Sequence, residues 1–114
     1  MSNHWPPAHE LAAKVDSDLL RAEFEDYAKT EWPPRLEVAM AVRGEISDAQ
    51  LAALADTTRQ TIEKVRTGQI VPREYLRYSI CIALECDVPA LYPYPTRREL
   101  LERIAARTGR AAAA

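Results

Sequence analysis

The chain has 114 residues, of which 47% are hydrophobic and 28% charged, and its net charge is −2. This composition fits one compact globular domain and disfavours two domains or a protein that coats nucleic acid without specificity. No apolar run reaches the ~20 residues that cross a bilayer, and the N-terminus lacks a signal-peptide pattern, so we expect a cytoplasmic protein. Only three glycines and an abundance of Ala, Leu, Glu and Arg favour helix, and we predict an all-α fold.

The N-terminal part is predicted to contain an arm and one long helix. Residues 1–9 include Pro6 and Pro7 and are expected to form a flexible arm. Residues 10–31 have the three- and four-residue apolar spacing of an amphipathic helix, carried by Leu11, Val15, Leu19, Leu20, Phe24 and Tyr27. The sequence Trp32-Pro33-Pro34 is expected to stop this helix, because proline disfavours helical geometry in the residue before it.

Residues 33–92 are predicted to form a core of five short helices. Ser or Thr precedes two of them, and its hydroxyl can accept the free backbone N–H groups of the first turn. Glycines follow the first and third helices and suit a left-handed exit. The predicted helices cover residues 36–44, 48–55 after the cap Ser47, 59–67 after the cap Thr58, 73–86 and 89–91.

Residues 93–110 are predicted to form a proline-rich connector and a last helix. Thr96 and Glu99 have the spacing of a capping box at its start. The helix carries several arginines, which either follow the DNA backbone or form a solvated edge: Arg97, Arg98, Arg103, Arg107 and Arg110. The alanine tail, residues 111–114, is either a frayed end or a signal for a bacterial protease.

The second and third core helices are joined by about three residues, which is the spacing of a helix-turn-helix unit. In such a unit the second helix can lie in the DNA major groove, although many helical corners have the same spacing. Residues 57–78 hold five basic and two acidic side chains. The spacing and the local charge together leave two interpretations of this helix pair: a DNA-reading element or an ordinary helical corner.

The residue identities strengthen the first reading. The segment LAALADTTRQTIEKVRTGQIVP, with ISDAQ before it and YLRYSICIALECDVPALY after it, resembles the Cro/repressor (XRE) family of helix-turn-helix regulators over about half of the chain. Matching positions are Leu51-Ala52 under the recognition helix, Thr57-Thr58 at the turn, Ile62 and Val65 on its buried side, Gly68 and Pro72 at its end, and Ala83-Leu84 and Leu91 in the last two helices. The resemblance implies a five-helix core with one added helix at each terminus.

The resemblance also implies which residues contact double-stranded DNA. The recognition helix would present Thr58, Arg59, Gln60, Thr61 and Lys64 to base edges. Arg can donate two hydrogen bonds to guanine, Gln can pair with adenine, and a Thr methyl group can meet thymine. Phosphate contacts would come from residues at helix starts and nearby basic side chains, namely Ser47, Arg66, Gln69, Arg73 and Arg77.

Three positions depart from the family pattern. Asp48 stands where a glutamine often supports a phosphate contact, and a carboxylate there would repel DNA. Asp56 replaces a common turn glycine, which is tolerable because Asp visits the left-handed region more readily than most residues. Arg66 replaces a structural acid near the end of the recognition helix.

Other functions find less support in the sequence. His4 and His9 lie in the predicted arm, and there is no carboxylate pair, Cys-His pair or phosphate loop, so we expect no enzyme, cofactor or metal site. Cys81 and Cys86 are expected to be buried free thiols. Family members commonly bind DNA as homodimers, and the N-terminal helix is the expected dimer element. Alternatively, this helix binds a toxin, and the protein is an antitoxin that represses its own promoter.

Overall fold

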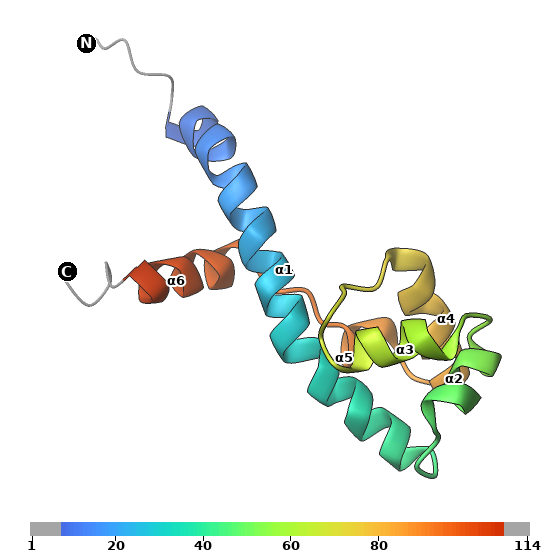
Figure 1. Cartoon of the computed structure of the whole chain (residues 1–114). Coiled ribbons are helices and arrows are strands. Elements are labelled where there is room, and N and C mark those ends of the chain that lie inside the picture. Colours follow the sequence, from blue (N-terminus) through green and yellow to red (C-terminus); the bar gives the residue numbers. More distant parts are fainter. Residues whose placement is uncertain (1–7, 109–114) are drawn as a thin grey trace, which may run out of the picture. The chain divides into compact units, whose positions relative to one another are not determined.

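The computed structural model describes the backbone of residues 8–108 and the side chains of residues 17–107. These residues form helices and no strands, which confirms the all-α prediction (Figure 1). None of the described helices is long and apolar enough to cross a membrane. The helices are α1 (Ala8–Val42), α2 (Asp48–Leu54), α3 (Arg59–Arg66), α4 (Glu74–Leu84), α5 (Val88–Leu91) and α6 (Arg97–Thr108).

The chain divides into two compact units. The central unit covers Asp26–Tyr94 and contains the second half of α1 together with α2 to α5. The terminal unit joins the residues up to Glu25 with those from Pro95 onward, and so combines the first half of α1 with α6. The predicted boundary near residue 33 therefore lies inside a helix.

The prediction that Trp32-Pro33-Pro34 ends the first helix is wrong, because α1 continues through both prolines. Proline lacks an N–H, so Pro33 cannot donate to the carbonyl of Lys29 four residues earlier. That carbonyl oxygen instead lies against Gly68, only 2.6 Å from where a Cβ atom would stand. The carbonyl that loses its helical hydrogen bond is thus the one that the segment after α3 approaches closely.

Tertiary packing of Trp32 keeps this part of α1 helical. Its side chain is 1% exposed, and its indole N–H donates to the Pro93 carbonyl at 2.9 Å. The Tyr92 ring meets it edge-on at 5.0 Å between centroids, and the Arg77 guanidinium lies 5.3 Å from the centre of the indole. These contacts outweigh the local preference of two prolines for a helix end, because a buried aromatic side chain contributes several kcal/mol.

Helices α2 and α3 begin at the caps predicted for them. Ser47 caps α2 in a capping box with Gln50, and Thr58 caps α3 by accepting the Thr61 N–H at 3.1 Å. Asp56 takes the left-handed conformation, with φ of 57°. The buried side chains of the pair are Leu51, Ala52, Ala55, Ile62 and Val65.

Gly68 provides a sharp test of how the segment after α3 is fixed. We expect Gly68→Ala to lower the free energy of unfolding by at least about 2 kcal/mol, because its φ is +77° and the new methyl group would meet the Lys29 carbonyl. Gly44→Ala is the matched control, since its φ is +89° but nothing lies within 4 Å of a Cβ there. Urea unfolding followed by circular dichroism measures both, and equal losses would contradict the close approach.

The terminal unit is held by a buried carboxylate. Glu23 of α1 is 2% exposed, and its Oε2 accepts from Arg103 Nε at 3.0 Å and from Arg107 Nη2 at 2.8 Å. The capping box of α6 is confirmed, with reciprocal bonds between Thr96 and Glu99, and the Thr96 N–H lowers the pKa of the Glu99 carboxyl. Arg103 and Arg107 are therefore engaged by Glu23, and Arg98 pairs with Glu102 on the same helix, while Arg110 lies outside the described residues.

The apolar stripe of the first half of α1 is only partly covered. Leu20, Phe24 and Tyr27 are half-buried, whereas Leu19 is 52% exposed. Leu11 and Val15 lie outside the described side chains. The structure thus leaves one large apolar residue of this predicted stripe in solvent.

Glu23→Gln tests the attachment of α6. The amide keeps the shape but loses the charge that holds two guanidinium groups, so we expect a loss of about 1–3 kcal/mol of stability in the terminal unit, discounted because both arginines are partly exposed. Limited proteolysis should cleave α6 faster in the variant. Glu102→Gln, which alters an exposed pair on the same helix, should leave the cleavage rate unchanged. Equal protection of α6 in Glu23→Gln and wild type would contradict the attachment.

Candidate nucleic-acid interface

Helix α3 has one buried and one open side. Ile62 and Val65 face the core and are 0% and 3% exposed. The predicted base-reading residues Arg59, Gln60 and Lys64 are exposed. The helix therefore offers three long polar side chains to solvent while its apolar side fixes its position.

The two threonines predicted to contact bases take part in the helix start. The Thr58 hydroxyl accepts the Thr61 N–H and lies 2.8 Å from the Thr61 hydroxyl. Thr58 is exposed and Thr61 is half-buried. Both side chains lie in the first turn of α3, next to Arg59 and Gln60, and their hydroxyl groups help to hold that turn.

Three of the residues predicted to contact phosphates are exposed. Ser47 lies at the start of α2, and Arg73 precedes α4 without a side-chain cap bond. Gln69 lies in the loop after α3, where its amide donates to the Thr67 hydroxyl at 3.0 Å. They come from separate loops, at the start of α2, after α3 and before α4.

Arg66 has an internal partner instead of an open position. Its guanidinium makes a two-bond contact with Asp48, with Nε and Nη2 each 2.9 Å from a carboxylate oxygen, and Nη1 lies 3.5 Å from Glu37. The bond to Asp48 raises the pKa of Arg66, opposed by desolvation. Arg66 is therefore corrected from a phosphate-contacting residue to one that joins α3 to α2 and α1.

Asp48 and Arg66, two of the positions that depart from the pattern of the resembled family, thus pair with each other. The carboxylate of Asp48, whose charge alone would repel DNA, is neutralised by the Arg66 guanidinium. Neither Asp48 nor Arg66 by itself predicts this pair. Their opposite charges, at positions that face each other in a helix-turn-helix unit, were the signal available in the sequence.

Arg77 is also corrected, because it is 9% exposed and belongs to the core. Its guanidinium donates to the Pro72 carbonyl at 3.3 Å and to the Tyr94 hydroxyl at 2.7 Å. It also lies 5.3 Å from the ring centres of both Trp32 and Tyr94. A side chain held by these contacts cannot reach a phosphate, and the sequence rule that places arginine in solvent fails here.

Asp48→Ala tests the compensation directly. The change frees the Arg66 guanidinium, so we expect DNA to bind more tightly by about threefold while the protein loses about 1 kcal/mol of stability, as is typical of partly exposed ion pairs. Asp56→Ala, which removes an exposed acid in the turn, is not a matched control, because φ at this position is positive and alanine is strained there. Asp87→Ala removes one exposed acidic charge at the start of α5 and serves instead. Weaker DNA binding by Asp48→Ala in a fluorescence titration would contradict the neutralising role.

Comparison of the chain with protein-family models, curated proteins and solved structures finds no match. Within the described residues, no group of three His, Cys, Asp or Glu side chains is arranged to hold a metal ion. The functional interpretation therefore depends on the geometry of α2, α3 and the loops around them.

Proposed function

We propose that this protein is a sequence-specific double-stranded DNA-binding transcriptional regulator, a repressor of the phage type, that reads the major groove with α3. The observation that carries the proposal is the exposure of Arg59, Gln60 and Lys64 on a helix whose opposite side is buried. A helix placed in this way behind a short turn has the form of a recognition helix.

The exposed groups have the chemistry that base reading requires. Arg59 would donate two hydrogen bonds to the O6 and N7 of guanine, and Gln60 would pair with the N6 and N7 of adenine. Thr58 and Thr61 lie beside them in the first turn and would contact a sugar or a thymine methyl group. Lys64, one turn further along α3, would reach a base edge or a phosphate.

Phosphate contacts would position the helix without reading sequence. After the two corrections above, Ser47, Gln69 and Arg73 remain as the proposed phosphate-contacting residues. The Asp48–Arg66 pair keeps a carboxylate near this surface from acting as an unpaired negative charge. Arg73 is expected to contribute about one unit to the slope of affinity against salt.

The expected DNA-bound form is a homodimer on two half-sites one helical turn apart. Such a dimer would produce an inverted repeat in the selected operator. Sedimentation of the protein alone and with DNA measures its oligomeric state. A strictly monomeric mass in both experiments would remove the dimer from the proposal.

The antitoxin alternative is favoured by one observation. Leu19, on the half of α1 that belongs to the terminal unit, is 52% exposed although it lies on the predicted apolar stripe. An apolar helix face of this kind can lie in the groove of a partner protein. Leu19→Glu should then abolish toxin binding, and operator binding should remain unchanged.

Selection from a random duplex pool with the purified protein tests the proposal. An enriched inverted repeat, bound with a steep dependence on salt concentration, is the expected outcome. Recovery of no common sequence after repeated rounds would overturn sequence-specific reading and move the search to protein partners.

A further inference from the structure

The last turn of α4 brings two cysteines together. The chain leaves the helix through Glu85 in a left-handed conformation, with φ of 55° and ψ of 48°. The Cys86 N–H donates to the Cys81 carbonyl at 3.0 Å, which is the six-to-one bond of a Schellman turn. Both cysteines are free, and the Cys86 side chain lies near enough to Cys81 to help raise the pKa of the Cys81 thiol. The turn at the end of α4 thus brings Cys81 and Cys86 together as a pair of thiols.

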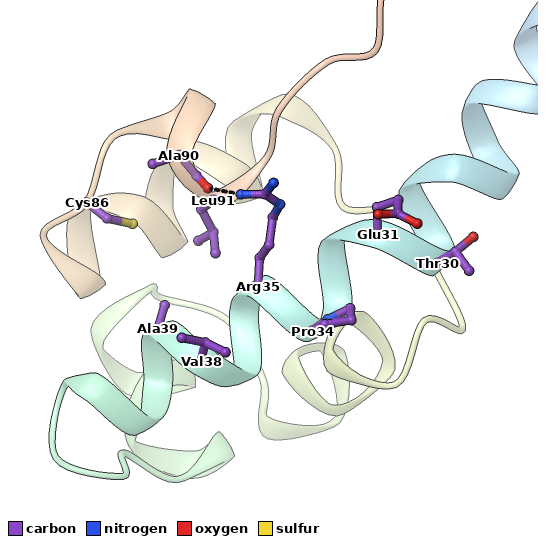
Figure 2. Close-up of a pocket in the computed structure, with 9 residues that line it drawn as sticks. All are labelled: Thr30, Glu31, Pro34, Arg35, Val38, Ala39, Cys86, Ala90 and Leu91. Carbon is purple, nitrogen blue, oxygen red and sulfur yellow. Dashed lines mark hydrogen bonds between the residues drawn. The ribbon is translucent and has the colours of Figure 1, made fainter. Parts of the chain in front are cut away.

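The two thiols differ in access. Cys81 is 2% exposed, and burial and then the neighbouring thiol raise its pKa to about 12. Cys86 is half-buried and lines a pocket of about 540 Å³ with α1 and α5 (Figure 2). Much of the wall is apolar, including Val38, Ala39 and Leu91. A small molecule in the pocket therefore meets Cys86, while Cys81 is buried outside the pocket lining as a protonated thiol.

A buried hydroxyl completes the cluster. Tyr92 is 1% exposed, and its hydroxyl has no hydrogen-bond partner among the residues that the structure describes. Burial first, and then the nearby Cys81 and Cys86, raise the pKa of Tyr92, so the phenol keeps its proton. Buried polar atoms without a partner are uncommon, since they cost about 1–3 kcal/mol. Here the atom is a proton donor close to two thiols.

We propose that Cys86, Cys81 and Tyr92 form a dithiol site that reduces a hydroperoxide. The Cys86 thiolate attacks the terminal peroxide oxygen and the O–O bond breaks. The departing oxygen takes a proton and leaves as an alcohol, or as water from hydrogen peroxide, and Cys86 becomes a sulfenic acid. The Tyr92 hydroxyl donates a hydrogen bond to the oxygen on Cys86.

The second step forms a disulfide. The Cys81 sulfur attacks the sulfenic sulfur, the S–O bond breaks, and the hydroxyl group leaves as water with the Cys81 proton. Two thiols are oxidised by two electrons and one peroxide is reduced, so atoms and electrons balance. The Schellman turn already holds the two residues adjacent, as a disulfide requires.

The test uses the reduced full chain without DNA, so its result is independent of the proposed DNA binding. Hydrogen peroxide and cumene hydroperoxide are added in separate arms, and free thiols and peptide maps are followed with time. We expect loss of both thiols with a Cys81–Cys86 link within one chain. The faster arm identifies the peroxide class, and an organic substrate is expected from the apolar wall. Disulfides only between chains, or thiols that outlast free cysteine in the same solution, would overturn the proposal.

Variants separate the roles of the three residues. Cys81→Ala should stop at a sulfenic acid on Cys86 that dimedone traps, and Cys86→Ser should abolish the reaction. Tyr92→Phe should slow the first step about fivefold, the loss typical of one hydrogen bond. Tyr78→Phe, on the exposed side of α4, is the matched control and should react like wild type. Circular dichroism confirms that each variant is folded. Wild-type rates in Cys86→Ser or Tyr92→Phe would overturn the role of that residue.

Discussion

Trp32→Ala is expected to lower the free energy of unfolding by about 3–5 kcal/mol, which is the usual cost of removing a large buried aromatic side chain. The indole lies at the junction of α1 with the segment around Tyr92 and with the Arg77 guanidinium. Its removal leaves a cavity, frees the Pro93 carbonyl and takes away one face of the cation–π contact. A loss of this size is a large fraction of the total unfolding free energy of a small domain.

Two further variants make the measurement specific. Trp32→Phe keeps an aromatic ring but loses the N–H donated to Pro93, so it should lose less than the alanine variant. Tyr75→Ala removes an aromatic ring that is 75% exposed and should change stability by less than about 0.5 kcal/mol. Denaturant unfolding gives all three values. A loss below about 1 kcal/mol in Trp32→Ala would contradict the packing that holds α1 together across its prolines.

Arg59→Ala is expected to weaken binding to the selected operator by about 1–3 kcal/mol, because one bidentate base contact is lost. The effect should be confined to particular base pairs, so that the variant accepts sequences that the wild type rejects. The Arg59 side chain is exposed at the first position of α3, and its removal should leave the stability of the fold unchanged.

Arg21→Ala is the matched control for this variant, since it removes one exposed positive charge from the terminal unit. It should change neither the sequence preference nor the affinity by more than about twofold. Equal losses in the two variants, without a change in base preference, would indicate a general charge effect and would contradict base reading by Arg59.

The sequence was sufficient to predict those elements whose determinants are local. Ser47 and Thr58 mark the starts of α2 and α3, and both caps form as expected. Thr96 and Glu99 likewise mark the start of α6. A cap depends on residues within one turn, so a few neighbouring positions carry the full signal.

The features that were missed depend on contacts between distant segments. The local rule for proline predicted a helix end at residue 33, but the burial of Trp32 against residues about sixty positions away holds α1 continuous. Arg77 was expected in solvent because its aromatic and carbonyl partners are not visible from its neighbours in sequence. The predicted DNA contacts of the exposed α3 residues remain predictions. The internal partners of Arg66 and Arg77 could be identified only from the structure.

The most direct test of base reading by α3 is a nuclear magnetic resonance titration of the ¹⁵N-labelled chain with the selected duplex. We predict that the largest amide and side-chain shifts fall on residues 58–64, including the Arg59 guanidinium and the Gln60 amide, with smaller shifts at Ser47, Gln69 and Arg73. A scrambled duplex should shift the signals of Ser47, Gln69 and Arg73 and leave those of residues 58–64 nearly unchanged. Large shifts confined to α6 or to the first half of α1, with α3 unaffected, would contradict the proposal that this helix reads DNA.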